Sequence, residues 1–194
     1  MTIHQFTWSY VHWMVAARLG PTETGVYAGC LTIAFLSNPV ILGLSNLLGA
    51  RCSRSYSDGG EKQLTQAVTK STRLYVATMA TFVVGIILLG EPVLLVVFDN
   101  SNFENRGAIL SILSLAIAFL AIAIPSANGL WAMQRPLDVC SASLSGLATV
   151  IATSFFCISS FGLVGAAVGL LLGSIVEATT TILYFHRAIA HKRR

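Results

Sequence analysis

Long runs of apolar residues, separated by short polar connections, most constrain how this chain can fold. Four runs are clear: 26–50, 74–90, 108–133 and 139–159. A fifth run at 163–185 is interrupted only by Glu177 and by several glycines and threonines. A helix needs about 20 mostly apolar residues to cross about 30 Å of hydrocarbon. Each run therefore has the length and character of a membrane-spanning helix.

The composition agrees with a membrane protein rather than with a soluble domain. Hydrophobic residues make up 55% of the 194 residues and charged residues only 10%, and the mean hydropathy is +0.74. Soluble domains carry about 25% charged residues. No connection is long enough to hold a soluble domain. We therefore predict a single all-α domain over 1–194, a polytopic bundle of about six membrane-spanning helices.

The N-terminal run, "FTWSYVHWMVAARLG", leaves the helix count open. It is shorter than the others and carries Ser9, His12 and several aromatic side chains. It is a span over 4–18, a span without its beginning, or an amphipathic helix lying in the membrane interface. The first alternative gives six crossings and the last gives five. No signal peptide is predicted, because no basic segment and cleavage site frame an apolar core.

Local signals predict where the helices end. Gly20-Pro21 ends the first helix, Thr22 or Thr24 caps the second, and Asp58-Gly59-Gly60 makes a turn. The remaining connections are expected at three short polar stretches: 99–102, 134–136 and 159–162. These turns join helices that follow one another closely in the chain.

Positive charge is distributed unevenly among the predicted connections. Five Lys and Arg lie in 51–73, Arg135 lies in the fourth connection, and four lie in the tail at 186–194. Six alternating helices place these three segments on one side, and only Arg18 and Arg106 on the other. Cytoplasmic segments of membrane proteins are rich in Lys and Arg. We therefore predict that the basic loop at 51–73, the basic tail and both termini are cytoplasmic. We also predict that the chain is a multi-pass protein of the plasma membrane, which in bacteria is the inner membrane.

Two interpretations of the basic stretch remain open. In the first, its charges set the orientation in the membrane and contact anionic lipids. In the second, four of its cations hold an anionic substrate head group: Arg51, Arg54, Lys70 and Arg73. The net charge of +4 requires no nucleic acid partner, because the basic residues sit at predicted membrane edges.

Small residues recur every fourth position in the last two predicted helices. One row is Ser141, Ser145, Thr149 and Thr153, and the other is Gly165, Gly169 and Gly173. Residues four apart share a helix face, and small residues let helices approach closely in membranes. We expect the two rows to pack on each other or on neighbouring helices.

The glycine row continues to Glu177 and then to Thr181. An ionisable side chain inside a membrane span is costly and therefore points to a function. Glu177 is a candidate for proton or cation coupling, or for contact with a polar substrate. The structural alternative is a neutral or hydrogen-bonded carboxyl group two turns from the cytoplasmic end of the helix.

Two prolines interrupt predicted spans, at Asn38-Pro39 and at Ile124-Pro125-Ser126. Each proline removes one helical hydrogen bond and frees a carbonyl group. Polar side chains near these positions are candidates for the lining of a substrate cavity: Asn38, Asn46, Asn128, Trp131 and Gln134. Kinked helices suit a transporter that changes between two states, although kinks also occur in static bundles.

Enzymatic chemistry has no visible basis in the sequence. The four cysteines show no metal-ligand spacing, and the histidines stand near the chain ends. Neither a phosphate-binding glycine loop nor a nucleophile elbow nor an HExxH motif occurs. We therefore predict that the chain is not an enzyme and uses no metal or other cofactor.

Five segments taken in order carry a resemblance to a known family. They are "RLGPTETGVYAG", the stretch from "NPVILG" to "KSTRLY", "LLGEPVLLVVFDN", "PSANGLWAMQRP" and "FGLVGAAVGLLLGSIVEA". Together they resemble the C-terminal half of polysaccharide flippases, the O-antigen type exporters of the multidrug, oligosaccharidyl-lipid and polysaccharide (MOP) superfamily. The resemblance covers nearly the whole chain.

The resemblance implies a six-helix lobe that faces a homologous N-terminal lobe across a cavity. In the family, undecaprenyl-pyrophosphate-linked sugars move across the membrane by alternating access. This sequence departs from the family because it holds no N-terminal lobe, where most of the family's charged cavity residues lie.

Three functions are therefore expected in order. The first is a lipid-linked oligosaccharide flippase half that works with a second polypeptide or as a homodimer. The second is a cation-coupled multidrug exporter lobe, and the third is a non-transporting membrane interaction protein. In each case the lipid bilayer is the surrounding partner.

Overall fold

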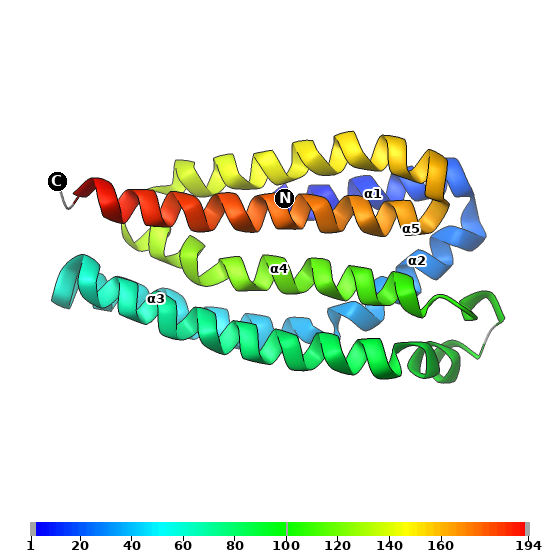
Figure 1. The fold of residues 1–194 in the computed structure, drawn as a ribbon, viewed down its shortest axis with the longest axis horizontal. Helices are drawn as coiled ribbons and strands as arrows, with labels where there is room; N and C mark the ends of the chain where they lie inside the picture. Colours follow the sequence, from blue (N-terminus) through cyan, green and yellow to red (C-terminus); the bar gives the residue numbers. More distant parts are fainter. Residues whose placement is uncertain (1–2, 100, 193–194) are drawn as a thin grey trace.

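The computed structural model describes residues 3–99 and 101–192, and every regular element within them is helical. The elements are α1 (Ile3–Leu19), α2 (Pro21–Ala34), the 3₁₀ turn η1 (Phe35–Ser37), α3 (Asn38–Phe98), the 3₁₀ turn η2 (Ser101–Phe103), α4 (Gly107–Ala132) and α5 (Pro136–Lys192). The long helices lie side by side along one axis (Figure 1). The predicted all-α bundle is confirmed.

The two longest helices are hairpins. In α3 the chain reverses at Gly59 and Gly60, and in α5 it reverses at Gly162. Gly60 has φ 60° and ψ −147°, and Gly162 has φ 57° and ψ −131°, a backbone region that is essentially restricted to glycine. We call 38–58 and 61–98 the first and second arms of α3. Likewise, 136–161 and 163–192 are the first and second arms of α5.

The basic stretch differs from the expected loop. Residues 51–73 are helical on both sides of Gly59 and Gly60, so the connection between the two arms of α3 is only a tight reversal. Lys, Arg, Gln and Glu are good helix formers, and their polarity alone does not end a helix. The predicted tail is likewise helical as far as Lys192.

The other helix ends agree with the predicted turns, with one difference in capping. Gly20 occupies the N-cap of α2 with φ 85°, and Pro21 opens the helix. The Thr24 hydroxyl donates a 2.7 Å hydrogen bond to the Gly20 carbonyl, whereas no threonine serves as the N-cap. Asp99 and Gln134 adopt positive φ values of 41° and 58°, where α3 ends and where α4 turns into α5.

The two prolines have different effects. Before Pro39 the helix tightens into η1, and the Ser37 hydroxyl donates to the carbonyl of Ala34 at 2.9 Å. This interruption is confirmed. Around Pro125, in contrast, α4 stays helical from end to end. Pro125 is buried, and packing on both sides holds the helix together despite the missing amide hydrogen.

The centre of the bundle is α4, which packs against both α3 and α5 (Figure 1). Its buried residues lie on more than one face, among them Leu110, Leu113, Ile117 and Leu130. A helix that is apolar around most of its circumference is stable only when it is surrounded. Its composition therefore places α4 inside the bundle.

Each end of the bundle gathers different connections. One end carries the Gly59–Gly60 reversal, the α4–α5 turn and the end of α5, and the other end carries Gly20, the α3–α4 connection and Gly162 (Figure 1). The Gly59–Gly60 reversal, the turn with Arg135 and the end of α5 thus lie at one end, which we call the basic end. At the opposite end, Arg106 pairs with Glu23 at 2.7 Å, and Arg18 donates to the Ser159 hydroxyl at 3.0 Å.

Helix α1 packs lengthwise against α5 and lies in the half of the bundle near the opposite end (Figure 1). Val11 and Val15 of α1 are completely buried. Such packing favours a helix within the bundle over one lying flat in the interface. Within the described residues, three helical stretches are long and apolar enough to cross a membrane: Pro21–Phe98, Gly107–Ala132 and Pro136–Ala190. Since the first and last contain hairpins, the number of crossings stays a prediction.

Candidate functional site

The two arms of α5 pack together over the predicted glycine row. The row is Gly165, Gly169 and Gly173, and all three residues are buried. A Cβ atom on Gly169 would lie 2.7 Å from the Ser154 hydroxyl, and one on Gly173 would overlap the side chain of Val150. No larger residue fits between the arms at these positions. The glycine row therefore forms the close helix contact that the sequence predicted.

In the described part of the chain, the serine and threonine row hydrogen-bonds to the glycine row only at Thr153. Ser141, Ser145 and Thr149 each donate to a carbonyl group of their own arm, at 2.7 to 2.9 Å. Thr153 donates to the Thr149 carbonyl at 2.7 Å and also reaches the Gly169 carbonyl of the glycine row at 3.5 Å.

The closest contacts of Gly169 and Gly173 come from the neighbouring face of the first arm, where Ser143 also lies. Ser143 was not among the predicted site residues. The spacing of Ser143, Gly146, Val150 and Ser154, which puts them on one helix face, was the sequence signal that could have identified it.

At the end of the glycine row, three helical segments bring polar side chains together around Glu177. The Ser143 hydroxyl donates a 2.6 Å hydrogen bond to Glu177 Oε1. His4 Nε2 of α1 lies 3.5 Å from the same oxygen. The Glu177 side chain is only 12% exposed, whereas that of His4 is 49% exposed. We call these three residues the carboxyl site.

The carboxyl site lies deep in the bundle. Glu177 is midway between Gly162 and Lys192 in the second arm of α5, so it is not near the end of its helix as the structural alternative expected. A cavity of about 10 Å³ adjoins the carboxylate and is lined from three helices, by Trp8 of α1, Leu120 of α4 and Ser174 of α5 among others. Such a volume holds about one water molecule.

This geometry limits what the carboxyl site can do. The cavity is too small for an organic substrate. A carboxylate and an imidazole can exchange a proton when an imidazole nitrogen lies next to a carboxylate oxygen. The hydrogen bond from Ser143 ties the carboxylate to the first arm of α5. Within residues 3–99 and 101–192, no group of three His, Cys, Asp or Glu side chains is placed to hold a metal ion.

The other polar candidates do not converge on Glu177. None of Asn38, Asn46, Asn128, Trp131 and Gln134 is among the residues that line the cavity beside Glu177. Asn128 is half-buried and donates to the Ile124 carbonyl of its own helix at 3.0 Å, facing Gly49 of α3. Trp131 is 54% exposed, and Gln134 is exposed in the α4–α5 turn. Their role as the lining of a substrate cavity stays a prediction.

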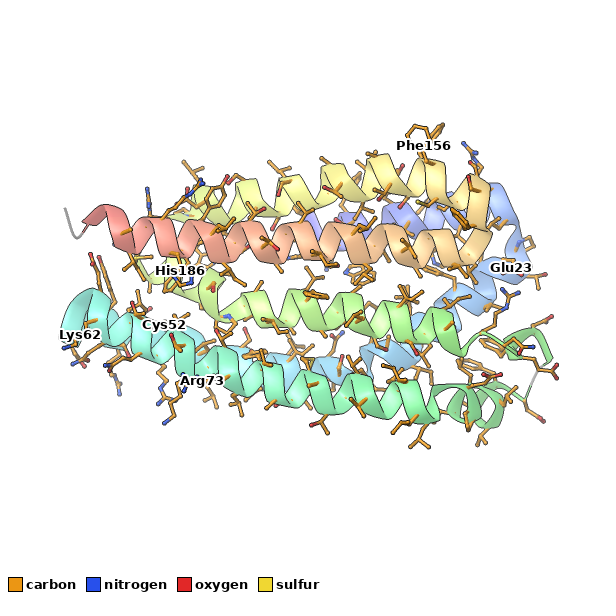
Figure 2. All side chains as sticks on the ribbon, viewed as in Figure 1. Glu23, Cys52, Lys62, Arg73, Phe156 and His186 are labelled. Carbon is orange, nitrogen blue, oxygen red and sulfur yellow. The ribbon has the colours of Figure 1, made fainter. Side chains whose placement is uncertain are left out.

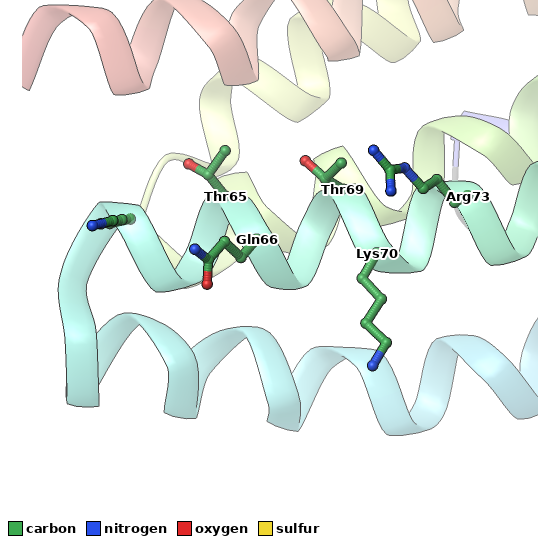
Figure 3. A pocket seen from close by; sticks show the side chains of 6 residues that line it. Thr65, Gln66, Thr69, Lys70 and Arg73 are labelled. Carbon is green, nitrogen blue, oxygen red and sulfur yellow. The ribbon is translucent and has the colours of Figure 1, made fainter.

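The basic candidates fall into two neighbouring grooves of α3. Lys70 and Arg73 line an open groove of about 600 Å³ together with Lys62 and three uncharged polar residues, Thr65, Gln66 and Thr69 (Figure 3). We call it the basic groove. Arg51 lines a second, smaller groove between the two arms, and Arg54 lies in neither. Figure 2 shows where Lys62 and Arg73 lie along the second arm of α3.

A family comparison covers nearly the whole chain. The model described as "Lipid II flippase MurJ" matches residues 15–193. Two curated proteins named probable multidrug resistance protein NorM, from Brucella suis biovar 1 and Brucella melitensis biotype 1, are each 32% identical over 115 residues. That match covers 59% of this chain and 23% of either relative.

Solved structures share the fold at low sequence identity. A mutant MATE protein superimposes with a TM-score of 0.88 and MATE in the bent conformation with 0.85, each at 14% identity. An outward-facing multidrug resistance MATE transporter of the MOP superfamily gives 0.71. In all three cases at least 97% of this chain is covered, but it spans only 43% of the other chain. The predicted lobe architecture is thereby confirmed.

Proposed function

Because the chain belongs to the MurJ lipid II flippase family, we propose that it forms one lobe of a transporter that moves a lipid-linked glycan across the membrane. The family match over residues 15–193 is the observation that carries this proposal. The helical bundle, with its exposed apolar side chains, supports a location in the bilayer. Transport by alternating access requires a second lobe that closes the cavity from the other side. In the family that the sequence resembles, this lobe is the homologous N-terminal lobe.

The second lobe is the first partner in this proposal. This chain spans 43% of the solved transporter chains that it resembles, which supports an arrangement with a further lobe of similar size. That lobe comes from a longer polypeptide, from a separate polypeptide, or from a second copy of this chain. The lipid bilayer surrounds both lobes.

The substrate proposed here is a glycan on a lipid pyrophosphate carrier. The family's description names lipid II, whereas the sequence resemblance pointed to O-antigen type units. Both proposals share an anionic lipid-linked head group, and the O-antigen unit remains the finer proposal. The cavity at Glu177 is too small to hold a sugar, and contact between the sugar and the five other polar candidates stays a proposal.

In this proposal Glu177 couples transport to protons. Three observations support that role: its position in the middle of the second arm of α5, its burial, and its contacts with Ser143 and His4 on two other helical segments. Protonation of the carboxylate removes its attraction for the imidazolium form of His4. The contact between α1 and α5 therefore differs between the two protonation states.

A multidrug exporter lobe is the second candidate function. The 32% identity with two proteins named NorM over 115 residues favours it, and so does a protonatable site within the bundle. The two candidates differ in substrate chemistry, because a lipid-linked glycan is anionic and membrane-anchored. Enzymatic activity is not part of either candidate.

The experiment uses vesicles that contain the chain together with its N-terminal lobe. We expect a fluorescent lipid-linked glycan to become accessible to an impermeant quencher on the far side. Translocation should fall at least tenfold with Glu177→Gln but not with the matched change Glu104→Gln, because Glu104 is exposed at the opposite end. Failure to bind any candidate lobe and to move the glycan would overturn the proposal. Transport of a cationic dye instead would favour the multidrug function.

A further inference from the structure

A second groove opens between the two arms of α3, near the basic end of the bundle. The residues that line it are Leu44, Leu47, Leu48 and Arg51 of the first arm and Ser71, Leu74 and Tyr75 of the second arm. Its volume is about 160 Å³. The Tyr75 hydroxyl donates to the Ile41 carbonyl at 3.2 Å and holds the two arms together at the base of the groove. We call it the interarm groove.

The lining of the interarm groove is apolar over most of its length and cationic at one end. Leu47 is 75% exposed and Leu74 is 52% exposed, so hydrocarbon can contact both side chains. Arg51 follows Leu47 and Leu48 by one turn, in the direction of the Gly59–Gly60 reversal. An acyl chain of a phospholipid can lie along the apolar part of this groove while the phosphate contacts the guanidinium group at its end.

The groove also lies at the level where both arms change from apolar to polar sequence. The apolar run of the first arm ends at residue 50, directly before Arg51, and that of the second arm begins at residue 74, directly after Arg73. Lipid head groups occupy this level of a membrane protein. A lipid that enters the groove from the bilayer therefore brings its phosphate beside Arg51.

A second cation, Lys70, lines the basic groove and directly precedes Ser71, a residue of the interarm groove. Lys70 extends toward the first arm of α3, whereas Thr69 and Arg73 are directed to the other side of their helix (Figure 3). The three ion pairs within the described residues involve His4, Arg106 and Arg135, so neither Arg51 nor Lys70 takes part in one. Two cations without an acidic partner at the end of an apolar groove favour an anionic occupant.

From this arrangement we propose that the interarm groove binds an anionic phospholipid of the membrane. Arg51 and Lys70 contact its phosphate, and one acyl chain lies against Leu47 and Leu74. The bound lipid is a resident of the bilayer and not the transported substrate. This site is separate from the carboxyl site, and it does not depend on which substrate the transporter moves.

The test places an indole reporter in the groove by Leu74→Trp. The purified protein is inserted into phosphatidylcholine vesicles that contain a fixed minor fraction of brominated phosphatidylglycerol or, in a parallel sample, of brominated phosphatidylcholine. Bromine quenches a nearby indole on contact. The emission of the parent protein, which has three tryptophans of its own, is subtracted.

We expect stronger quenching by phosphatidylglycerol than by phosphatidylcholine. Arg51→Gln or Lys70→Gln should raise the phosphatidylglycerol fraction needed for half-quenching about fivefold, since one cation near an anionic surface contributes an affinity change of that order. Lys62→Gln is the matched control, because Lys62 lines the basic groove as Lys70 does but lies eight residues nearer the Gly59–Gly60 reversal, away from Ser71 and Leu74 of the interarm groove. It should leave the quenching curve unchanged.

Three results would overturn the proposal. Equal quenching by both brominated lipids would mean that the groove has no preference for charge. An equal effect of Lys62→Gln and Arg51→Gln would mean that diffuse attraction, and not a site, concentrates the lipid. Displacement of brominated phosphatidylglycerol by a much smaller amount of undecaprenyl phosphate would assign the groove to a carrier lipid instead.

Discussion

The hydroxyl of Ser143 donates a 2.6 Å hydrogen bond to the carboxylate of Glu177, and this contact joins the two arms of the α5 hairpin. The pair lies beyond the last contact of the glycine row, where the arms are close enough for a short serine to reach the carboxylate. His4 of α1 approaches the same oxygen. One carboxylate thus connects three helical segments.

Ser143→Ala should destabilise the protein through the loss of this hydrogen bond. A hydrogen bond to a charged group contributes about 1.5–3 kcal/mol, and Glu177 is only 12% exposed, so little water replaces the lost donor. We expect a lower midpoint of unfolding in detergent, measured by circular dichroism. The matched control is Ser141→Ala, because the Ser141 hydroxyl is exposed and bonds only to its own helix. An equal effect of the two changes would contradict a special role for Ser143.

Gly173→Ala should destabilise the bundle by separating the arms of α5. The added Cβ would overlap Val150 and would lie 2.9 Å from the carbonyl oxygen of Gly146, which is backbone and cannot swing away. Overpacking of this kind costs about 1–3 kcal/mol. The unfolding midpoint measures the effect. Gly43→Ala provides the control, because nothing lies within 4 Å of a Cβ there, and it should be neutral or slightly stabilising.

Gly162→Ala tests the reversal of α5 without any steric contact. No atom lies within 4 Å of a Cβ at this position, so the only cost is the backbone conformation at φ 57° and ψ −131°. Such conformations cost about 1–3 kcal/mol for residues other than glycine. The unfolding midpoint should fall, while Gly85→Ala, within a helical arm and without neighbours, should not lower it. A neutral result at Gly162 would mean that the reversal relaxes into another turn.

The sequence was most informative where one physical requirement dominates. Apolar runs predicted the helices, and small residues four apart predicted the close contact of the α5 arms, because nothing larger fits between them. Glycine and proline marked the reversals. The asymmetry of Lys and Arg predicted that the three basic segments share one end, and Figure 1 shows these segments at the same end.

Sequence reasoning was less informative where tertiary contacts decide. Polarity suggested a loop over 51–73, although a helix satisfies its backbone regardless of side-chain polarity. Ser143 and His4 were missed because their roles depend on which faces meet across 34 and 173 residues of separation from Glu177. The candidates Asn46 and Trp131 were chosen for their nearness to prolines, which does not determine the direction of a side chain.

The cysteines at the basic end should react at different rates. Cys140 is exposed and Cys52 is completely buried. Burial raises the pKa of the Cys52 thiol, an effect that the nearby Arg51 guanidinium opposes. A raised pKa leaves less thiolate at a given pH, so labelling of Cys52 should require unfolding and more alkaline solution. Mass spectrometry of maleimide adducts measures both sites in one sample. Equal rates in the folded protein would contradict the packing of α3 against α4.

Single cysteines at the two ends test the predicted orientation in the membrane. In a chain whose four native cysteines are replaced by alanine, Ser57→Cys and Leu137→Cys mark the basic end. Glu104→Cys and Ser160→Cys mark the opposite end, and all four native side chains are exposed. The positive-inside rule predicts labelling of the first pair from the cytoplasm only, and of the second pair from outside only. An impermeant maleimide applied to intact cells and to inverted vesicles distinguishes the two faces. The reverse pattern would overturn the predicted orientation. If the two cysteines of one pair were labelled from opposite sides of the membrane, they would not lie at the same end of the bundle.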